Sequence, residues 1–305
     1  MTNQRPTLAR PLAVAVLALA LAGCSLRQAA VRSVGGALAT GGTSWSSDDD
    51  PELVRDAAPF ALKTIESLLA EVPDDPQLLL AATSSFTQYS YAFVANQADY
   101  VEAEDLQEAI ALRARAVGLY RRALGYGLRG LEARHPGFEQ TLRADPAAAL
   151  APLRGDDVPL LYWTGAAWAA AFAIDVADSS LSVNQTAIEK MMRRALALDE
   201  GWEKGSLHDF FISWEAGHAS AGGTIDKAKE HFARAKALAG GQRVSPLVSY
   251  AESVLVAEQK KKEFEQALNE ALAIDIEKTA PEQRLANVLA QRRAKWLLSK
   301  IDELF

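Results

Sequence analysis

The chain has few cysteine, histidine and proline residues for its length. Among 305 residues there are one Cys, four His and 12 Pro. A single Cys excludes an intramolecular disulfide framework and a zinc site built from several thiolates. Basic residues are also a minority, 32 Lys and Arg against 39 Asp and Glu, and they form no basic tail. We therefore expect no nucleic-acid partner, because neutralising phosphates requires clustered Lys and Arg.

The sequence also lacks the signature motifs of common enzyme classes. It contains no Gly-x-Ser-x-Gly motif, no Gly-x-Gly-x-x-Gly after a strand pattern and no Gly-Lys-Ser/Thr phosphate loop. Glu215 and His218 form one Glu-x-x-His spacing, whereas carboxylate-bridged di-metal bundles need two such motifs and two further Glu. We predict that the protein is not an enzyme, with no catalytic residue, no metal and no cofactor; a metal enzyme using Glu215 and His218 is the alternative.

Alanine is abundant, with 58 residues, and 49% of the chain is hydrophobic. This apolar fraction is typical of globular proteins and excludes a wholly disordered chain. Alanine has the highest helix propensity, and apolar residues recur at spacings of three and four after residue 50. Strand patterns and hairpin turns are missing. The composition therefore predicts an all-α fold.

The first 24 residues resemble a bacterial lipoprotein signal. Arg5 and Arg10 precede an apolar stretch at 12–22, which is too short to span a bilayer. The motif LAGC at 21–24 resembles the lipobox, in which the thiol of Cys24 receives lipid. An ordinary secretory peptide with an incidental Cys is the alternative.

These features predict three segments along the chain. Residues 1–23 form the signal peptide, 24–50 a flexible Ser/Gly-rich tether after lipidated Cys24, and 51–305 a helical domain. Removal of the signal peptide changes the formal charge from −7 to −9. Ser25 follows the Cys, and in Gram-negative lipoproteins this favours the outer membrane. We therefore expect lipid anchoring at the periplasmic face of the outer membrane.

Turn motifs divide the helical domain into roughly ten helices, many of them in pairs. Asp50 before Pro51 predicts an N-cap and the first helical residue. Ala228, Phe232 and Ala235 have the small-large-small spacing found in the second helix of tetratricopeptide repeats. Related patterns occur at 61–68, 116–123, 188–195 and 264–271. They predict a cryptic tetratricopeptide-like α-solenoid.

Aromatic residues gather in three of the predicted helical regions. We take as candidates for lining a ligand or partner site Tyr89, Phe93, Tyr162, Trp163, Trp168, Phe172 and Trp214. Two interpretations stay open, an apolar cavity between helical layers or plain core. Tyr89 and Tyr91 lie two positions apart and cannot share one helix face. Six Arg between residues 113 and 134 are interpreted as a solvated face with acidic partners nearby, with an anion site as the alternative.

Several segments, taken in order, carry a resemblance to a known family. They are LYRRA at 119–123, YGLR at 126–129, DVP at 157–159, YWTGAAW at 162–168, MMRRALALD at 191–199, the helix at 228–241 and AQRRAKWLL at 290–298. Together they resemble the T-component lipoproteins of tripartite ATP-independent periplasmic (TRAP) transporters. The resemblance covers nearly all of residues 50–305.

The resemblance implies an all-α, tetratricopeptide-like, lipid-anchored periplasmic protein without enzyme activity. It implies association with the substrate-binding P-component, a periplasmic solute-binding protein. It also implies homo-oligomers, trimers among them, and an apolar channel or cleft for a hydrophobic small molecule. The alternative is an adaptor lipoprotein that scaffolds an envelope-assembly complex and binds no ligand.

Overall fold

The computed structural model describes residues 44–182, 185–219 and 222–305. The predicted signal peptide and the lipidation candidate Cys24 lie outside these residues. Within the described part, the chain forms helices and turns without a strand, which confirms the all-α prediction. Its helices include none that is long and apolar enough to cross a membrane.

Long helices alternate with short ones of four to seven residues. The α-helices are α2 (Pro51–Glu71), α3 (Pro76–Ser90), α4 (Asn96–Val101), α5 (Leu106–Arg134), α6 (Phe138–Ala144), α7 (Pro146–Leu150), α8 (Val158–Ile174), α9 (Ser179–Ser182), α10 (Gln185–Leu198), α11 (Ser206–Gly217), α12 (Ile225–Ala239), α13 (Ser245–Tyr250), α14 (Lys261–Ala273), α15 (Arg284–Ser299) and α16 (Ile301–Leu304). Two π-helical segments, η1 (Tyr91–Ala95) and η5 (Ala251–Leu255), continue α3 and α13. Short 3-10 turns are η2 (Gly155–Asp157), η3 (Trp202–Lys204), η6 (Ile276–Lys278) and η7 (Pro281–Gln283).

Capping residues explain where several of these helices begin. The Asp50 side chain accepts hydrogen bonds from the backbone N–H groups of Glu52 and Leu53, at 3.1 and 3.0 Å. These are donors that the first turn of a helix leaves without an intrahelical partner. The predicted N-cap at Asp50, with Pro51 as the first helical residue, is therefore confirmed.

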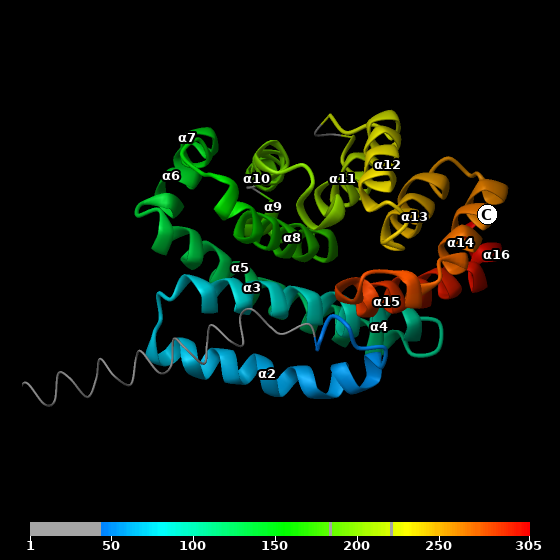
Figure 1. Ribbon diagram of the computed structural model, residues 1–305, viewed down its shortest axis with the longest axis horizontal. Coiled ribbons are helices and arrows are strands. Elements are labelled where there is room, and N and C mark those ends of the chain that lie inside the picture. The colour runs from blue at the N-terminus through cyan, green and yellow to red at the C-terminus, as the bar shows by residue number, and fades with distance from the viewer. Residues whose placement is uncertain (1–43, 183–184, 220–221) are drawn as a thin grey trace, which may run out of the picture.

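Successive long helices lie side by side, and the last one returns to the first (Figure 1). Contacts run from α2 to α3, α5, α8, α10, α11, α12, α13, α14 and α15 in turn, and α15 then contacts α2. The Leu285 N–H donates to the Ser46 carbonyl at 2.9 Å, and Arg292 pairs with Glu52 at 2.8 Å. The stack is compatible with the predicted solenoid, and α15 closes it into a ring.

The largest apolar cluster lies around α3, α5 and α8. Glycines on α5 allow α8 to approach closely: a Cβ on Gly127 would lie 2.2 Å from Thr164 Oγ1, and one on Gly130 would lie 2.9 Å from the Leu160 side chain. The α8 helix is apolar on nearly all sides and is largely covered by its neighbours.

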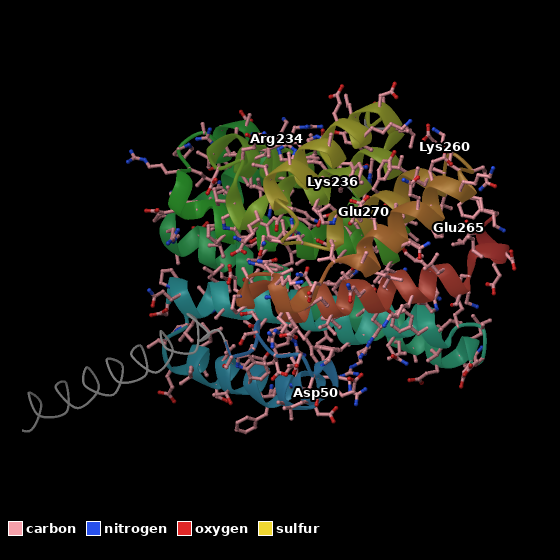
Figure 2. All side chains as sticks on the ribbon, turned by 45° about the vertical axis from the view of Figure 1, so that its right-hand side comes forward. Asp50, Arg234, Lys236, Lys260, Glu265 and Glu270 are labelled. Carbon is pink, nitrogen blue, oxygen red and sulfur yellow. The ribbon has the colours of Figure 1, made fainter. Side chains whose placement is uncertain are left out.

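The predicted repeat helix is α12. Ala228 and Ala235 are fully buried, and the ring of Phe232 stacks on Tyr250 with centroids 4.0 Å apart. Small residues at the contact allow the close packing of α11 and α12. Farther along α12, Lys236 pairs with Glu270 of α14 at 2.6 Å, on the face shown in Figure 2.

Candidate functional site

Helix α8 carries an aromatic group that is only partly covered. Tyr162 and Trp163 are half-buried, and their rings meet edge to face with centroids 5.0 Å apart. Trp202 of η3 contacts both, at 4.4 Å from Tyr162 and 6.4 Å from Trp163. Trp202 is not among the residues predicted from the sequence to line a site, although it follows the Gly201 turn directly. The structure thus adds one aromatic residue to two of the candidates.

Tyr91 of η1 is exposed, and charged residues from later elements act on its phenol. The Tyr91 side chain is 56% exposed. Burial nevertheless raises the pKa of its phenol to about 12, and the charge of Glu252 raises it further. Tyr89, two residues earlier, is buried in the core, so the expectation of different faces is confirmed.

The charge of Asp209 acts on phenols from two different helical elements. Burial also raises the pKa of Tyr162, and the charges of Arg243 and Asp209 act on this hydroxyl. Asp209 acts on the pKa of Tyr91 as well, and Tyr91 adds to the raised pKa of Tyr162. We call this group of aromatic side chains the aromatic recess and define it by Tyr91, Tyr162, Trp163 and Trp202.

A buried ion pair lies beside the aromatic recess. Asp209 of α11 accepts from Arg243 at 2.8 Å and from the Ser245 hydroxyl at 2.6 Å. Only about a tenth of either charged side chain is exposed. Because breaking a buried pair leaves an uncompensated charge, this contact fixes α11 against the start of α13.

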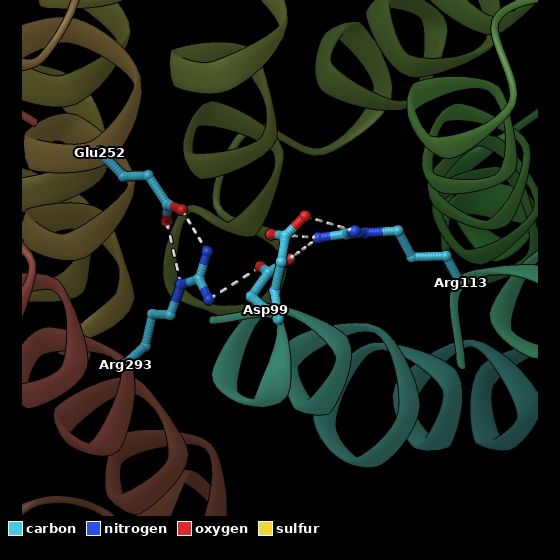
Figure 3. A network of polar contacts seen from close by, with 5 residues as sticks. Asp99, Arg113, Glu252 and Arg293 are labelled. Atoms are coloured by element: carbon cyan, nitrogen blue, oxygen red, sulfur yellow. Dashed lines mark hydrogen bonds and ion pairs between the residues drawn. The ribbon is translucent and has the colours of Figure 1, made fainter. Parts of the chain in front are cut away.

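A larger network of charges joins the first and last parts of the ring (Figure 3). Arg293 of α15 pairs with Glu252 of η5 and, at 2.9 Å, with Asp99 of α4. Arg113 of α5 pairs with the same Asp99 at 3.1 Å and with Glu102 at 2.8 Å. We call these five residues the closing network, because they link helices that are far apart in the sequence.

Arg293 is the central member of the closing network. Its side chain is 9% exposed. Its guanidinium lies 4.2 Å from the ring centroid of Trp296 and 5.9 Å from that of Tyr100. Burial acts to lower the pKa of Arg293, but the charge of Glu252 and the hydrogen bond to it outweigh burial and raise the pKa. Arg293 therefore stays charged between carboxylates and aromatic faces.

Both carboxylates bound by Arg293 belong to helices with a π-helical turn. Glu252 is part of η5, and Asp99 follows η1 by four residues. Single π turns inside α-helices are rare and frequently occur at functional sites. The two π-helical segments thus point to the same region as the aromatic recess and the closing network.

The other candidate residues lie outside the aromatic recess. Trp168 and Trp214 are buried in the core. Phe172 contacts His218 at 6.0 Å, and Trp214 stacks on the same imidazole at 3.9 Å. Phe93 is half-buried against Tyr89, with ring centroids 5.8 Å apart. The structure therefore separates the seven candidates into two recess residues and five that pack elsewhere.

Neither the Glu-x-x-His pair nor the Arg-rich helix forms an open ligand site. Glu215 is buried and pairs with Arg193 at 2.6 Å, while His218 Nδ1 lies 2.9 Å from the Trp214 carbonyl. In the described residues, no group of three or more His, Cys, Asp or Glu is placed to hold a metal ion.

The arginines of α5 are paired, mostly with partners from other elements. Arg121 pairs with Asp178, Arg122 with Glu66, and Arg134 with Asp157. Of the acidic residues near them in sequence, Glu102 pairs with Arg113.

Comparison with known proteins agrees with the fold. The model of one protein family, the TRAP transporter T-component, matches residues 47–305. The chain belongs to this family. An uncharacterized protein of Treponema pallidum (strain Nichols) is 28% identical to this T-component over 306 residues, which cover 94% of each chain. The resemblance identified from the sequence is confirmed.

Membership of the family defines the general role of this T-component. It is an accessory component of TRAP transport, and its place is the cell envelope. The family is not a known enzyme class. Family membership does not explain what the aromatic recess and the closing network of this chain do.

Proposed function

We propose that this T-component is a lipid-anchored periplasmic protein that binds the substrate-binding P-component and holds an apolar ligand in the aromatic recess. The observation that carries the ligand proposal is the contact of the Tyr162, Trp163 and Trp202 rings, which are only partly covered by the rest of the chain. Partly covered aromatic side chains offer a large apolar contact area without having to unfold any helix.

The chemistry of the aromatic recess favours an apolar ligand with a neutral polar group. Burial raises the pKa of both Tyr91 and Tyr162, so their phenols stay protonated and uncharged at neutral pH. A neutral phenol can donate a hydrogen bond to a carbonyl or hydroxyl oxygen. Trp163 and Trp202 supply apolar surface beside Tyr162.

The anchor and the partner complete the proposal. Lipid on Cys24 confines the protein to the periplasmic face of the outer membrane, where a soluble P-component can reach it. Confinement raises the effective concentration of a weakly binding partner. Homo-oligomers, trimers among them, are part of the same proposal, and sedimentation of the lipidated protein in detergent measures them.

The ligand proposal is tested with N-phenyl-1-naphthylamine, an uncharged apolar dye that fluoresces when shielded from water. We expect saturable binding with one dye per chain and at least a tenfold loss of affinity in the double variant Trp163→Ala with Trp202→Ala. Trp45→Ala is the control, because Trp45 is an accessible tryptophan on another part of the molecule. Equal affinity in a folded double variant would show that the dye does not bind in the recess. Trp168 is unsuitable for this test, because truncating a buried Trp costs about 3–5 kcal/mol.

The partner proposal is tested by capture of the tagged, lipidated protein from gently solubilised native cells, followed by mass spectrometry. A stoichiometric periplasmic solute-binding protein is the expected result. Recovery of outer-membrane assembly factors without a solute-binding protein would favour the adaptor role instead.

A further inference from the structure

The outer side of α2 carries an apolar stripe that no other part of the described chain covers. Phe60 is 80% exposed and Leu53 is 59% exposed, and Ala57 between them is exposed as well. The spacing 53, 57 and 60 places the three on one face of the helix. The inner face of α2 is apolar too, with Leu62 and Ile65 in the core. A helix at the surface of a soluble fold normally turns polar residues outward, so the outer stripe needs an explanation.

The position of α2 in the chain suggests what covers the stripe. Pro51, its first residue, follows Cys24 by 27 residues. A chain of that length reaches at most about 95 Å when fully extended, and α2 is the first helix that the structure describes after the proposed lipid anchor.

The charges of α2 allow it to approach a lipid surface despite the acidic chain. Glu52 pairs with Arg292 at 2.8 Å, Asp56 with Arg55 at 2.9 Å, and Glu66 with Lys63 at 2.5 Å. The helix therefore presents compensated charges around an apolar stripe. Anionic headgroups would repel free carboxylates but not these pairs.

A second copy of the chain fits the stripe less well than lipid does. Each partner in a stable protein dimer buries about 800 Å². Two large side chains and one methyl group supply a small part of such an area. The same residues suffice for insertion at a bilayer interface, where apolar side chains add a second attachment to an acyl anchor.

We propose that the outer face of α2, defined by Leu53, Ala57 and Phe60, lies in the headgroup region of the membrane that holds the lipid anchor. The proposal rests on the proposed lipidation of Cys24 and adds an orientation to it. Because α12 lies on the opposite side of the molecule from α2 (Figure 1), this orientation turns α12 toward the periplasm.

The sequence permits a direct test with a single reporter. Cys24 is the only Cys, and lipidation consumes its thiol, so Phe60→Cys gives the lipidated protein one free thiol. A polarity-sensitive fluorophore on that thiol is read on vesicles of phosphatidylethanolamine and phosphatidylglycerol that contain nitroxide-labelled lipid. Ala237→Cys is the matched control, an exposed position on α12.

We expect lipid nitroxides to quench the label at position 60 at least fivefold more strongly than the label at position 237. Equal quenching at the two positions would overturn the proposal. A blue shift at position 60 that appears without vesicles and grows with protein concentration would overturn it as well, because a second copy would then cover the stripe.

Two further measurements distinguish an error in the proposed lipidation of Cys24 from an error in the proposed membrane contact of α2. The intact mass of the mature protein shows whether Cys24 carries lipid. The labelled Cys24→Ser protein is then held on the same vesicles through an N-terminal histidine tag and a nickel-chelating lipid. Stronger quenching at position 60 in that arrangement supports the membrane contact without lipidation, and equal quenching at positions 60 and 237 rejects it.

Discussion

The first and last parts of the ring are held together by different forces. From α2 to α10 the helices share one continuous apolar cluster, which also reaches α11. From α12 to α16 the apolar residues form two smaller clusters. Charged residues there supply the long-range ties, with Arg293 reaching Asp99 and Arg292 reaching Glu52. The last part of the ring therefore packs on α11, and ion pairs tie its far end to α2 and α4.

The largest effect is expected from the apolar core of the first part. Phe86 of α3 is almost fully buried and contacts Tyr126 of α5 at 5.8 Å. We expect Phe86→Ala to lower the free energy of unfolding by about 3–5 kcal/mol, because it removes a large apolar side chain and leaves a cavity. Urea unfolding measures the loss.

A matched truncation in the last part tests whether the two parts of the ring unfold separately. Phe264→Ala removes an equally buried ring from α14. We expect it to reduce hydrogen-exchange protection in α13 to α15 while α3, α5 and α8 stay protected. Equal loss of protection in both parts would show that the ring unfolds as one unit.

The second prediction concerns the close contact of α5 with α8. Gly127→Ala would bring a Cβ to 2.2 Å from Thr164 Oγ1, and we expect a loss of about 1–3 kcal/mol from overpacking. Gly125→Ala is the control, because a Cβ there meets nothing within 4 Å. In the helix interior that control should gain up to about 1 kcal/mol. Equal changes in the free energy of unfolding of the two variants would show that α8 does not approach α5 closely at Gly127.

The third prediction compares two neighbouring arginines of the last part. Arg293→Met removes a charged hydrogen bond to Glu252 and an ion pair with Asp99, and we expect a loss of about 1–3 kcal/mol with faster hydrogen exchange in η1 and η5. Arg292→Met breaks an accessible pair with Glu52, for which about 0–1 kcal/mol is expected. Equal losses of stability in the two variants would show that the buried ion pairs of Arg293 stabilise the ring no more than the accessible pair of Arg292.

The smallest effect on stability at neutral pH is expected from a pair of histidines, one on α11 and one on α12. The Nδ1 atoms of His208 and His231 lie 2.8 Å apart. Burial lowers the pKa of His231 to about 4, with repulsion from His208 adding to the shift. Because the unfolded value is about 6.5, protonation favours the unfolded chain. Stability is therefore complete above about pH 6.5 and falls as the pH approaches 4.

Unfolding experiments between pH 7.5 and 4.5 measure this loss, and His231→Gln should flatten the profile. Around the pair, Glu200 accepts from His208 Nε2 at 3.0 Å, and the charges of Arg193 and Lys227 act on His231. An unchanged slope in the variant would mean that other groups cause the acid sensitivity.

Local rules explain why the sequence predicts the helical elements. The Asp50 cap with Pro51 depends on a few adjacent residues, and it occurs in the structure. The burial of Ala228 and Ala235 follows from helical periodicity alone. Such features need no knowledge of distant contacts, so composition and spacing suffice for the fold class.

The candidate site depends on long-range contacts and was only partly predictable. Tyr162 and Trp163 were found because they lie in one aromatic segment. Arg293 and Asp99 are 194 positions apart, and closure of the ring alone brings them together. Trp202 joins the recess through a short 3-10 turn, which has no apolar period to reveal it. Of the acidic partners expected near the α5 arginines, Glu102 does pair with Arg113, whereas the partners of Arg121 and Arg122 come from other parts of the chain that no local pattern indicates.

The π-helical turn η1 also bears on how such a protein can change by small insertions and deletions. An α-helix turns by about 100° per residue, so loss of one codon within residues 91–95 would convert the wide turn into an ordinary one. The wide turn takes up one extra residue within about one rotation of the helix, so the side chains after it would keep about the same faces and Asp99 would still face Arg293. One codon can therefore be lost at this place without opening the ring, while the reading frame and the hydrophobic pattern before it stay the same.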